Sequence, residues 1–328
     1  MSNSDITLKD LADLATPMAV RVAVTLRIAH RIAAGRRLIK ELADDVDAKA
    51  DLLERVLLHL VSVGLFHRDD LGAFSLTPLG EQMLVESGPG ATPPWLDLGS
   101  ALGRAEMSFT RLLETVMTGE VAYTAQYGRT FWEDLDGNPS WSAQFDAALA
   151  RGMERRAREV AQAYDWAALG EVVDIGGGDG TLLVALLRAH PALRGTVVDR
   201  SPEPAKRTLQ EAGLSERANV VAGSFFEPLP RGAGGYVLSR IQSNWSDADL
   251  RTILSRCAEA SGAGGKVIVI DELVADVAVA TESDLRMLVY FGGRERTAAH
   301  VRDVAADVGL SLESLLVVGD WTILELES

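Results

Sequence analysis

A glycine-rich segment flanked by acidic residues is the part of the sequence that most clearly suggests chemistry. Residues 174–181 read Asp-Ile-Gly-Gly-Gly-Asp-Gly-Thr, after a short β-branched run and before an apolar helical pattern from Leu182 to His190. Glycines at the carboxyl end of a strand let a ligand approach the backbone closely. Asp199 ends the next β-branched run, where a carboxylate accepts hydrogen bonds from a ribose diol. The pattern predicts a bound nucleoside, because a tight turn without a ligand does not explain three adjacent glycines.

Two common nucleotide-binding motifs do not fit this segment. The dinucleotide fingerprint of dehydrogenases has a third glycine where Thr181 stands. The phosphate-binding loop of nucleoside triphosphatases needs Gly-Lys-Ser or Gly-Lys-Thr, which the segment lacks. The segment therefore favours an adenosyl group over a dinucleotide.

The elements that position this segment alternate between short β-branched runs and helical patterns. Such an alternation forms a parallel sheet with right-handed crossovers. The last two runs are so close in sequence that we expect a terminal hairpin. We predict an α/β domain over residues 166–328, with a doubly wound, mostly parallel, Rossmann-like sheet. Its expected strands are 172–175, 196–199, 220–221, 236–238, 267–270, 315–318 and 322–326.

The N-terminal segment, residues 1–90, reads as helices joined by short turns. Apolar residues repeat at three- and four-residue spacing from Ala48 to Phe66, which indicates an amphipathic helix. A shorter helical pattern, 38–46, precedes it, and a hairpin around 69–72 follows, which is the outline of a winged helix. Charges of both signs cancel on the expected recognition helix, between Lys49 and Arg55. We therefore predict a helical scaffold or dimerisation module in preference to a DNA-binding domain.

Residues 91–165 are predicted to be a helical connector rich in aromatic side chains. Tyr123, Tyr127, Phe131 and Trp132 cluster in it. Aromatic rings supply a large apolar area at low entropic cost, which suits core packing or a flat ligand. We expect core packing for most of these rings and a contribution of the connector to a substrate pocket.

The composition excludes several classes of protein. The 328 residues include 32 Lys and Arg against 47 Asp and Glu, a formal charge of −15, and one cysteine, Cys257. This acidity repels nucleic-acid phosphates and anionic lipids. A single cysteine excludes an intramolecular disulfide and a cysteine-rich metal site, and no metal is predicted. With no visible signal peptide and no run of about 20 apolar residues, we expect a cytoplasmic protein that binds neither nucleic acid nor membrane.

Four ordered motifs resemble those of one enzyme family. They are residues 173–180, 223–230, 243–245 and 292–297. Together they resemble the S-adenosylmethionine-dependent small-molecule O-methyltransferases of the plant caffeate and acetylserotonin type, from about residue 15 to the end. Residues 284–289 and the lack of a histidine base resemble the bacterial anthracycline-type enzymes, which include hydroxylase relatives. The resemblance implies S-adenosylmethionine as cofactor, a dimerisation role for the winged helix, a homodimer, and a partner helix that helps to line each pocket.

By this resemblance, the cofactor lies along the carboxyl ends of the strands. The loop from Gly176 to Gly180 holds the methionine end and Asp199 the ribose hydroxyls. Phe225 and Phe226 lie at the adenine, and Arg151 reaches the cofactor carboxylate. The implied cofactor-binding residues are Asp174, Gly176, Gly178, Asp199, Ser224, Phe225, Phe226, Ser239, Arg240, Trp245 and Arg151.

Serines replace three functional residues of the plant enzymes. Ser239 stands where many relatives carry a lysine, although the anthracycline-type enzymes also use serine there. Ser224 stands where many carry an aspartate that reaches the adenine amine. Ser243, before Asn244 and Trp245, stands where the plant branch has the histidine that removes the acceptor proton. Because a serine has no useful basicity near pH 7, it does not replace the imidazole by itself.

Two carboxylates occupy family positions beside the missing base. Asp271 ends the fifth expected strand, and Glu295 stands at the family's second carboxylate. Either residue accepts a proton if burial raises its pKa towards 7, orients the acceptor hydroxyl, or only caps structure. The candidate catalytic residues are Asp271, Glu295, Ser243 and Asn244.

Three mechanisms compete for this site. In the one we favour, the acceptor is an acidic phenol or hydroxyquinone, and proximity of methyl and oxygen supplies most of the rate. In the second, Asp271 or Glu295 is the base. In the third, methyl transfer is lost and the cofactor is kept structurally, as in some anthracycline-type hydroxylases. A ligand-responsive DNA regulator is an alternative from another class, which the charge-neutral recognition helix disfavours.

The predicted function is methyl transfer from S-adenosylmethionine to a hydroxyl of an aromatic polyketide-like or quinone acceptor. Without an imidazole base, an amine acceptor also stays open. Tyr290 and Phe291 are equally well explained as a core pair. The candidate substrate-binding residues are Trp141, Phe145, Met153, Met287, Tyr290 and Phe291.

Overall fold

The computed structural model describes residues 7–85, 92–150, 153–262, 264–275 and 281–328. The chain packs as two compact units, Met1–Met107 and Ser108–Ser328. The predicted domain boundaries at residues 90 and 165 stay a prediction. Among the described residues, none of the helices has the length and apolar character needed to cross a membrane.

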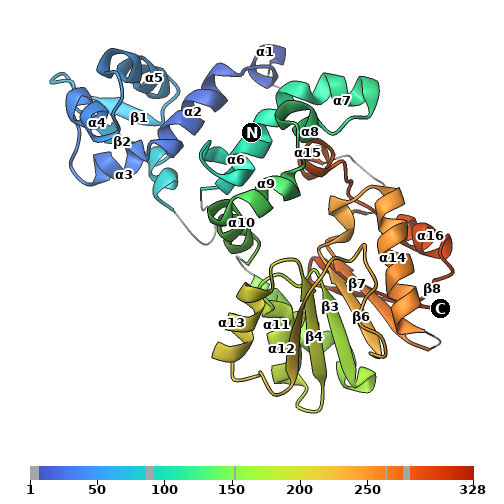
Figure 1. Cartoon of the computed structure of the whole chain (residues 1–328). Coiled ribbons are helices and arrows are strands. Elements are labelled where there is room, and N and C mark those ends of the chain that lie inside the picture. The colour runs from blue at the N-terminus through green and yellow to red at the C-terminus, as the bar shows by residue number, and fades with distance from the viewer. Residues whose placement is uncertain (1–6, 86–91, 151–152, 263, 276–280) are drawn as a thin grey trace. The chain divides into compact units, whose positions relative to one another are not determined.

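The first unit consists of short helices and a small antiparallel hairpin (Figure 1). Its central helix, α5 (Ala50–Ser62), buries Leu53, Leu57 and Leu60 on one face, as the three- and four-residue spacing predicts. The hairpin pairs β1 (Phe66–Arg68) with β2 (Phe74–Leu76). The helical N-terminal domain is confirmed. Its other helices are α1 (Leu8–Leu11), α2 (Ala15–Thr25), α3 (Ile28–Ala33), α4 (Ile39–Asp45) and α6 (Ala101–Glu106), with 3₁₀ turns at Gly80–Leu84 and Pro94–Leu96.

The second unit is built on a seven-stranded sheet in the order β5-β4-β3-β6-β7-β9-β8. The first five strands in this order run parallel, and β9 and β8 are antiparallel to their neighbours. The predicted doubly wound, mostly parallel sheet with a terminal hairpin is therefore confirmed. The strands are β3 (Glu171–Ile175), β4 (Arg194–Asp199), β5 (Ala218–Ala222), β6 (Gly235–Ser239), β7 (Lys266–Asp271), β8 (Ser311–Val318) and β9 (Trp321–Glu327).

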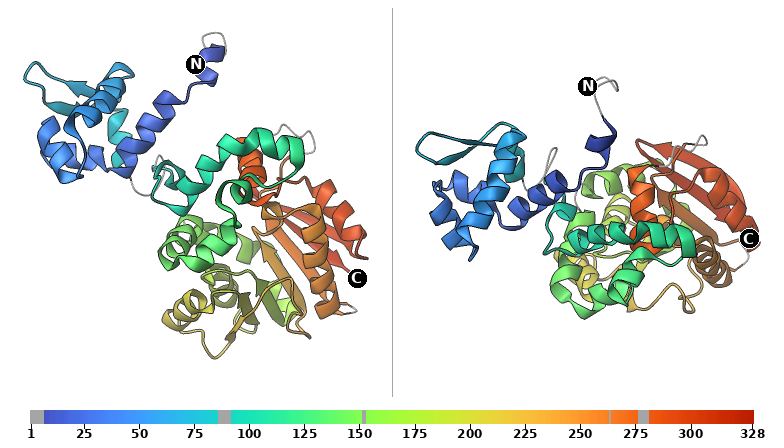
Figure 2. Two further views of the ribbon diagram at one scale, coloured as in Figure 1. Left: turned by 45° about the horizontal axis from the view of Figure 1, so that its top comes forward. Right: turned by 90° about the horizontal axis from the view of Figure 1, so that it is seen from above.

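Helices cover both faces of this sheet, as two further views show (Figure 2). Val173 and Ile175 of β3 pack with α14 (Asp247–Ser261) and α16 (Ala298–Ala306). Val172, which points to the opposite face, packs with α11 (Met153–Ala163), α12 (Thr181–Ala189) and α13 (Pro202–Glu211). Cys257 of α14 is completely buried in the first of these layers.

Helices of the second unit that precede the sheet in sequence supply several of the aromatic side chains near the strand ends. They are α7 (Leu112–Thr118), α8 (Ala122–Tyr127), α9 (Phe131–Gly137) and α10 (Pro139–Ala150), and α15 (Glu282–Phe291) contacts α8. Since the chain crosses to opposite sides of β3 to form β4 and β6, the carboxyl ends of these three strands border the crevice where open α/β sheets bind ligands.

Candidate functional site

The glycine loop after β3 has a backbone that only glycine adopts without strain. Gly176 has φ +66°, and a Cβ atom there would lie 2.7 Å from Cδ1 of Ile241. Gly178 has φ +56°, and its N–H donates a hydrogen bond to Oδ2 of Asp199 at 3.0 Å. The other oxygen of Asp199 accepts a hydrogen bond from the N–H of Ser201 at 2.9 Å. The loop and the end of β4 are therefore held together beside the crevice.

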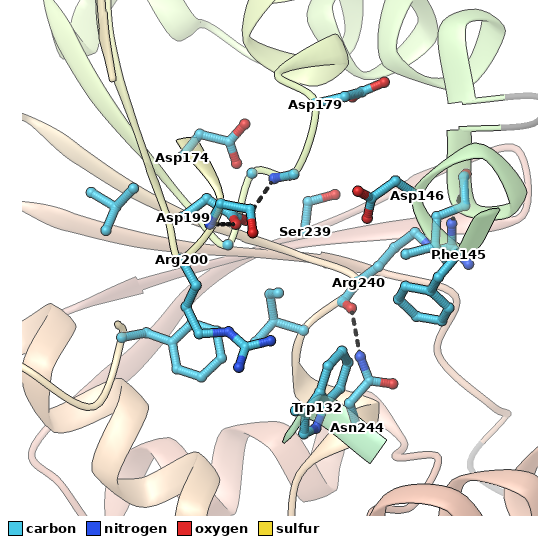
Figure 3. A pocket seen from close by; sticks show the side chains of 18 of the residues that line it. Trp132, Phe145, Asp146, Asp174, Asp179, Asp199, Arg200, Ser239, Arg240 and Asn244 are labelled. Atoms are coloured by element: carbon cyan, nitrogen blue, oxygen red, sulfur yellow. Dashed lines mark hydrogen bonds between the residues drawn. The ribbon is translucent and has the colours of Figure 1, made fainter. Parts of the chain in front are cut away.

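A cavity of about 310 Å³ lies at this point, within the size range of small-molecule sites (Figure 3). One part of its wall carries carboxylates from the glycine loop and the end of β4, and another part carries aromatic rings. Thirteen of the predicted site residues line it. They are Asp174, Gly176, Gly178, Asp199, Ser224, Phe225, Phe226, Ser239, Arg240, Trp245, Asn244, Phe145 and Met153.

Asp174 is the most unusual of the acidic residues in the wall. Its side chain is 1% exposed, and within the described structure neither carboxylate oxygen has a hydrogen-bond partner. Burial, followed by the charges of Asp199 and Asp179, raises the pKa of its carboxyl to about 7. The buried hydroxyl of Ser239 also lacks a partner among the described residues. Unpaired buried polar groups lower the stability of the folded protein. This wall therefore suits a ligand that donates hydrogen bonds or carries positive charge.

The structure adds residues that the sequence did not single out as site residues. Asp146 of α10 lines the cavity, and burial, then the charges of Asp199 and Asp179, raise its pKa to about 6. Arg200 also lines it, paired with Asp136 at 2.7 Å. One signal for Asp146 was available, because it follows the predicted pocket residue Phe145 directly in sequence.

The aromatic part of the wall is centred on Trp132, which the sequence placed in the aromatic cluster without a site role. Its ring stacks on Trp245 at 5.7 Å between centroids and on Phe291 at 5.1 Å, with interplanar angles of 15° and 17°. The guanidinium of Arg200 lies 5.8 Å from the same ring, and Phe145 packs against it edge-on at 5.9 Å. These rings form a rigid apolar surface suited to a flat ligand.

Three of the four predicted catalytic residues do not line the cavity. Asp271 is 6% exposed, accepts a hydrogen bond from Nε2 of Gln242 at 3.1 Å, and has a pKa that burial raises to about 6. Glu295 accepts a hydrogen bond from the Thr281 hydroxyl at 2.6 Å. The carbonyl oxygen of Ser243 accepts a hydrogen bond from the N–H of Arg294. The fourth, Asn244, does line the cavity, and its amide donates to the carbonyl oxygen of Arg240. A base role for Asp271 or Glu295 stays a prediction.

A buried arginine fixes the turn that carries Asn244 and Trp245. The guanidinium of Arg296 is completely buried and donates hydrogen bonds to Oδ1 of Asp247 at 2.7 and 3.0 Å. It also donates to the carbonyl oxygens of Gln242 and, at 2.8 Å, of Trp245. Arg296 therefore holds one aromatic wall of the cavity without lining it.

The remaining predicted residues that the structure describes do not line the cavity. Tyr290 is 3% exposed and packs edge-on against Phe109, so it is placed as a core residue. Trp141 and Met287 do not line the cavity, and Phe291 reaches it only through its stack on Trp132. Arg151 lies outside the described residues.

The residues of the cavity fit an adenosyl donor with cationic groups. The glycine loop leaves backbone room beside the unpaired carboxylate of Asp174, and Phe225 and Phe226 supply apolar rings at the same strand ends. Within the described residues, no group of three or more His, Cys, Asp or Glu side chains has the arrangement to hold a metal ion. The acidic part of the wall suits a ligand that carries positive charge.

Known protein families and relatives match nearly the whole chain. Residues 109–311 match the family model of the O-methyltransferase domain, and residues 9–86 match that of the O-methyltransferase dimerisation domain. The chain is 50% identical, over 98% of its length and 97% of the relative, to a 2,7-dihydroxy-5-methyl-1-naphthoate 7-O-methyltransferase of Streptomyces carzinostaticus. It is 40% identical to an aclacinomycin 10-hydroxylase of Streptomyces purpurascens, over 97% of this chain and 87% of that one.

A solved structure agrees with this placement. An O-methyltransferase from neocarzinostatin biosynthesis, crystallised with S-adenosyl-L-homocysteine and 1,4-dihydroxy-2-naphthoic acid, superposes with a TM-score of 0.93. The two chains are 49% identical, and the match covers 99% of each. The glycine loop, the sheet topology and the dimerisation domain thus agree with the resemblance of the four motifs, and the chain belongs to the family of S-adenosylmethionine-dependent O-methyltransferases.

Proposed function

We propose that the protein methylates a hydroxyl group of a flat aromatic acceptor, of the size of a hydroxynaphthoate or hydroxyquinone. The observation that carries this proposal is the two-part cavity, in which a carboxylate-lined wall meets an aromatic wall. The first wall suits a cationic nucleoside and the second a planar ring. The naphthoate substrate named for the relative that is 50% identical supports this acceptor class.

Each wall has a distinct task in this proposal. The glycine loop and Asp174 bind the methionine end of the cofactor, and Asp199 accepts hydrogen bonds from its ribose. Phe226, with Phe225 beside it, packs at the adenine ring. Trp245, whose ring packs edge-on against both phenylalanines, lies beside the adenine as well. Trp132, supported by its stack on Phe291, contacts the acceptor ring and brings its hydroxyl to the reacting methyl group.

The mechanism we propose relies on proximity and on an acidic acceptor. S-Adenosylmethionine supplies the methyl group: the acceptor oxygen forms the new O–C bond as the C–S bond breaks, the hydroxyl proton passes to solvent, and S-adenosylhomocysteine remains. Ser243, Asp271 and Glu295 lie outside the cavity wall, which favours this route over the carboxylate base. The stacked rings hold the acceptor in place and exclude water, and correct placement alone supplies a large part of a rate.

A labelled-methyl assay tests the proposal. The purified protein is incubated with methyl-labelled S-adenosylmethionine and a panel of hydroxynaphthoates and hydroxyquinones, including 2,7-dihydroxy-5-methyl-1-naphthoate. We expect a labelled methyl ether and S-adenosylhomocysteine in equal amounts. The matched control is the same acceptor with its hydroxyls already methylated, and amino analogues separate O- from N-methylation. A hydroxylated product without S-adenosylhomocysteine would contradict the proposal and place the protein with its hydroxylase relative.

We also propose that the protein works as a homodimer. The match of residues 9–86 to a dimerisation domain supports this, as do the apolar side chains exposed on α1, where Leu8 is 82% and Leu11 is 74% exposed. Light scattering coupled to gel filtration should give about twice the monomer mass. A monomer at micromolar concentration would contradict the proposal.

A further inference from the structure

A carboxylate that does not come from the sheet faces the acidic wall of the cavity. Asp146 lies on α10, directly after Phe145, and its carboxylate points into the cavity (Figure 3). It forms no hydrogen bond or ion pair with any described residue. Burial, and then the nearby charges of Asp199 and Asp179, disfavour the ionised form of its carboxyl and raise its pKa. Asp146 is therefore a half-buried carboxylate that no described residue neutralises.

The described lining of the cavity carries an excess of negative charge. Its basic side chains, among the residues that the structure describes, are Arg200, which is paired with Asp136, and Arg240, which donates to the carbonyl oxygen of Leu149 at 3.2 Å. Neither arginine forms an ion pair with Asp146. The five carboxylates that line the cavity are Asp136, Asp146, Asp174, Asp179 and Asp199.

The unpaired carboxylate of Asp174 is a second feature that indicates a positively charged ligand. Asp174 is completely buried with both oxygens unpaired among the described residues. A buried carboxylate with unpaired oxygens lowers the stability of the folded protein. Such a group is therefore typical of a functional site. Since the described side chains offer no arrangement for a metal ion, the expected ligand is an organic cation.

The position of Asp146 gives it a task that the strand-end carboxylates do not share. Phe145 and Leu149 on the same helix belong to the apolar lining, whereas Asp179 and Asp199 belong to the acidic wall. Asp146 therefore stands where the two parts of the cavity meet. A methyl group that passes from a donor in one part to an acceptor in the other has to cross this boundary.

We propose that Asp146 binds the positively charged sulfonium group and thereby makes the site prefer S-adenosylmethionine to S-adenosylhomocysteine. This inference rests on the proposed methyl transfer. The two molecules share the adenine, the ribose and the amino acid, and they differ by one methyl group and one positive charge. Contacts with the shared groups do not separate them. A carboxylate at the boundary does, since it attracts the sulfonium and gains nothing from the neutral thioether of the product.

Titration calorimetry with the two ligands tests this without any turnover. An opposite charge within about 4–6 Å changes the protonation equilibrium of a carboxyl group by about 10- to 1,000-fold, which measures the strength of the charge–charge interaction. For a half-buried group such as Asp146 we expect the lower end of that range. At pH 8 we expect Asp146→Asn to weaken binding of S-adenosylmethionine by about 10-fold and binding of S-adenosylhomocysteine by less than about twofold. Asp146→Glu, which keeps the charge, should retain most of the preference.

The pH dependence of binding provides a second test. The pKa of Asp146 is raised to about 6, and the groups that face it are Asp179 and Asp199, with Asp174 and the two arginines in the same lining. The wild-type ratio of the two dissociation constants should favour S-adenosylmethionine more strongly at pH 8 than at pH 5.5, because the carboxylate is mostly protonated at the lower pH. Asp174 titrates in the same range, so the same ratio for Asp146→Asn should change less with pH. The sulfonium lowers the pKa of the α-amino group of S-adenosylmethionine relative to that of S-adenosylhomocysteine, so the titration of each free ligand is measured separately and removed from the ratio.

The possible outcomes separate this inference from the proposed function. Equal weakening of both ligands, no weakening of either, or a constant wild-type ratio between pH 5.5 and 8 would overturn the role of Asp146. A loss of kcat with both dissociation constants unchanged would make it a proton acceptor instead. If neither ligand binds the wild type, the proposed function itself fails. Asp303→Asn, which removes one exposed charge on α16, is the matched control and should bind both ligands as the wild type does.

Discussion

Replacing Asp174 by asparagine should stabilise the ligand-free protein more at pH 8.5 than at pH 5.5. The carboxyl of Asp174 is completely buried, its oxygens have no partner in the described structure, and its pKa is raised to about 7, chiefly by burial. The substitution keeps the shape of the side chain and removes its charge. Its effect on unfolding therefore measures the cost of ionising this one group.

The sign and size of the effect follow from the two pKa values. The unfolded chain releases the proton near pH 3.8 and the folded protein near pH 7. Between these values the folded state holds the extra proton, so the free energy of unfolding falls as the pH rises. A shift of about 3 units corresponds to on the order of 4 kcal/mol in total, of which about 2 kcal/mol is lost between pH 5.5 and 7.

Urea unfolding of both proteins, followed by circular dichroism without ligand, gives the comparison. We expect the stability of Asp174→Asn relative to wild type to rise by about 2 kcal/mol from pH 5.5 to pH 8.5. The cost of burying an unpaired amide is the same at both pH values and cancels. Asp303→Asn should keep the wild-type pH dependence, because its carboxylate is exposed. Parallel curves for wild type and Asp174→Asn would refute the reasoning.

Three further substitutions test the rest of the site. Trp132→Ala should raise KM for the aromatic acceptor by about 10-fold, because it removes apolar contact area and a ring contact worth about 1 kcal/mol beyond that area. The same substitution should leave the affinity for S-adenosylmethionine within about twofold of the wild-type value. Arg296→Met should lower the free energy of unfolding by about 3 kcal/mol, because it leaves Asp247 without its buried partner. Gly176→Ala should cost about 1–2 kcal/mol of stability and weaken cofactor binding at least about 10-fold, since its Cβ would strike Ile241 and φ is positive.

Matched variants make these three tests decisive. Trp132→Phe keeps a ring and should recover most of the acceptor affinity, whereas equal KM values for the alanine and wild-type proteins would exclude a stacking role. The double variant of Arg296→Met with Asp247→Asn should regain part of the stability, and strict additivity would argue against the ion pair. Gly213→Ala also places a side chain at positive φ, at +70°, but Gly213 does not line the cavity, so this variant should leave cofactor binding intact.

The sheet and the glycine loop could be predicted because their signals are local. The β-branched run before Gly176 and the apolar helix after it appear in one stretch of sequence, and all seven expected strands are present. Asp174, Asp199 and the phenylalanines at 225 and 226 follow strand ends, which a parallel sheet brings to a single edge. Local pattern and topology together were sufficient for this half of the cavity.

The other half depends on how separate helices pack, which spacing does not reveal. Asp146 and Trp132 lie on two short helices, and neither position carries a pattern that indicates its direction. Family position likewise placed Asp271 at the site, but its side chain hydrogen-bonds Gln242 away from the cavity wall. Glu295 is engaged by the Thr281 hydroxyl in a similar way. In these cases a tertiary hydrogen-bond partner decides the orientation of the side chain.

The burial of Cys257 makes the protein well suited to site-specific labelling. Burial raises the pKa of this thiol, and thiol reagents react with the exposed thiolate form. The native chain, whose one cysteine this is, therefore offers no reactive thiol in its folded state. A cysteine introduced at an exposed position such as Asp303 would be the single attachment point for a dye or spin label, with the native core left intact.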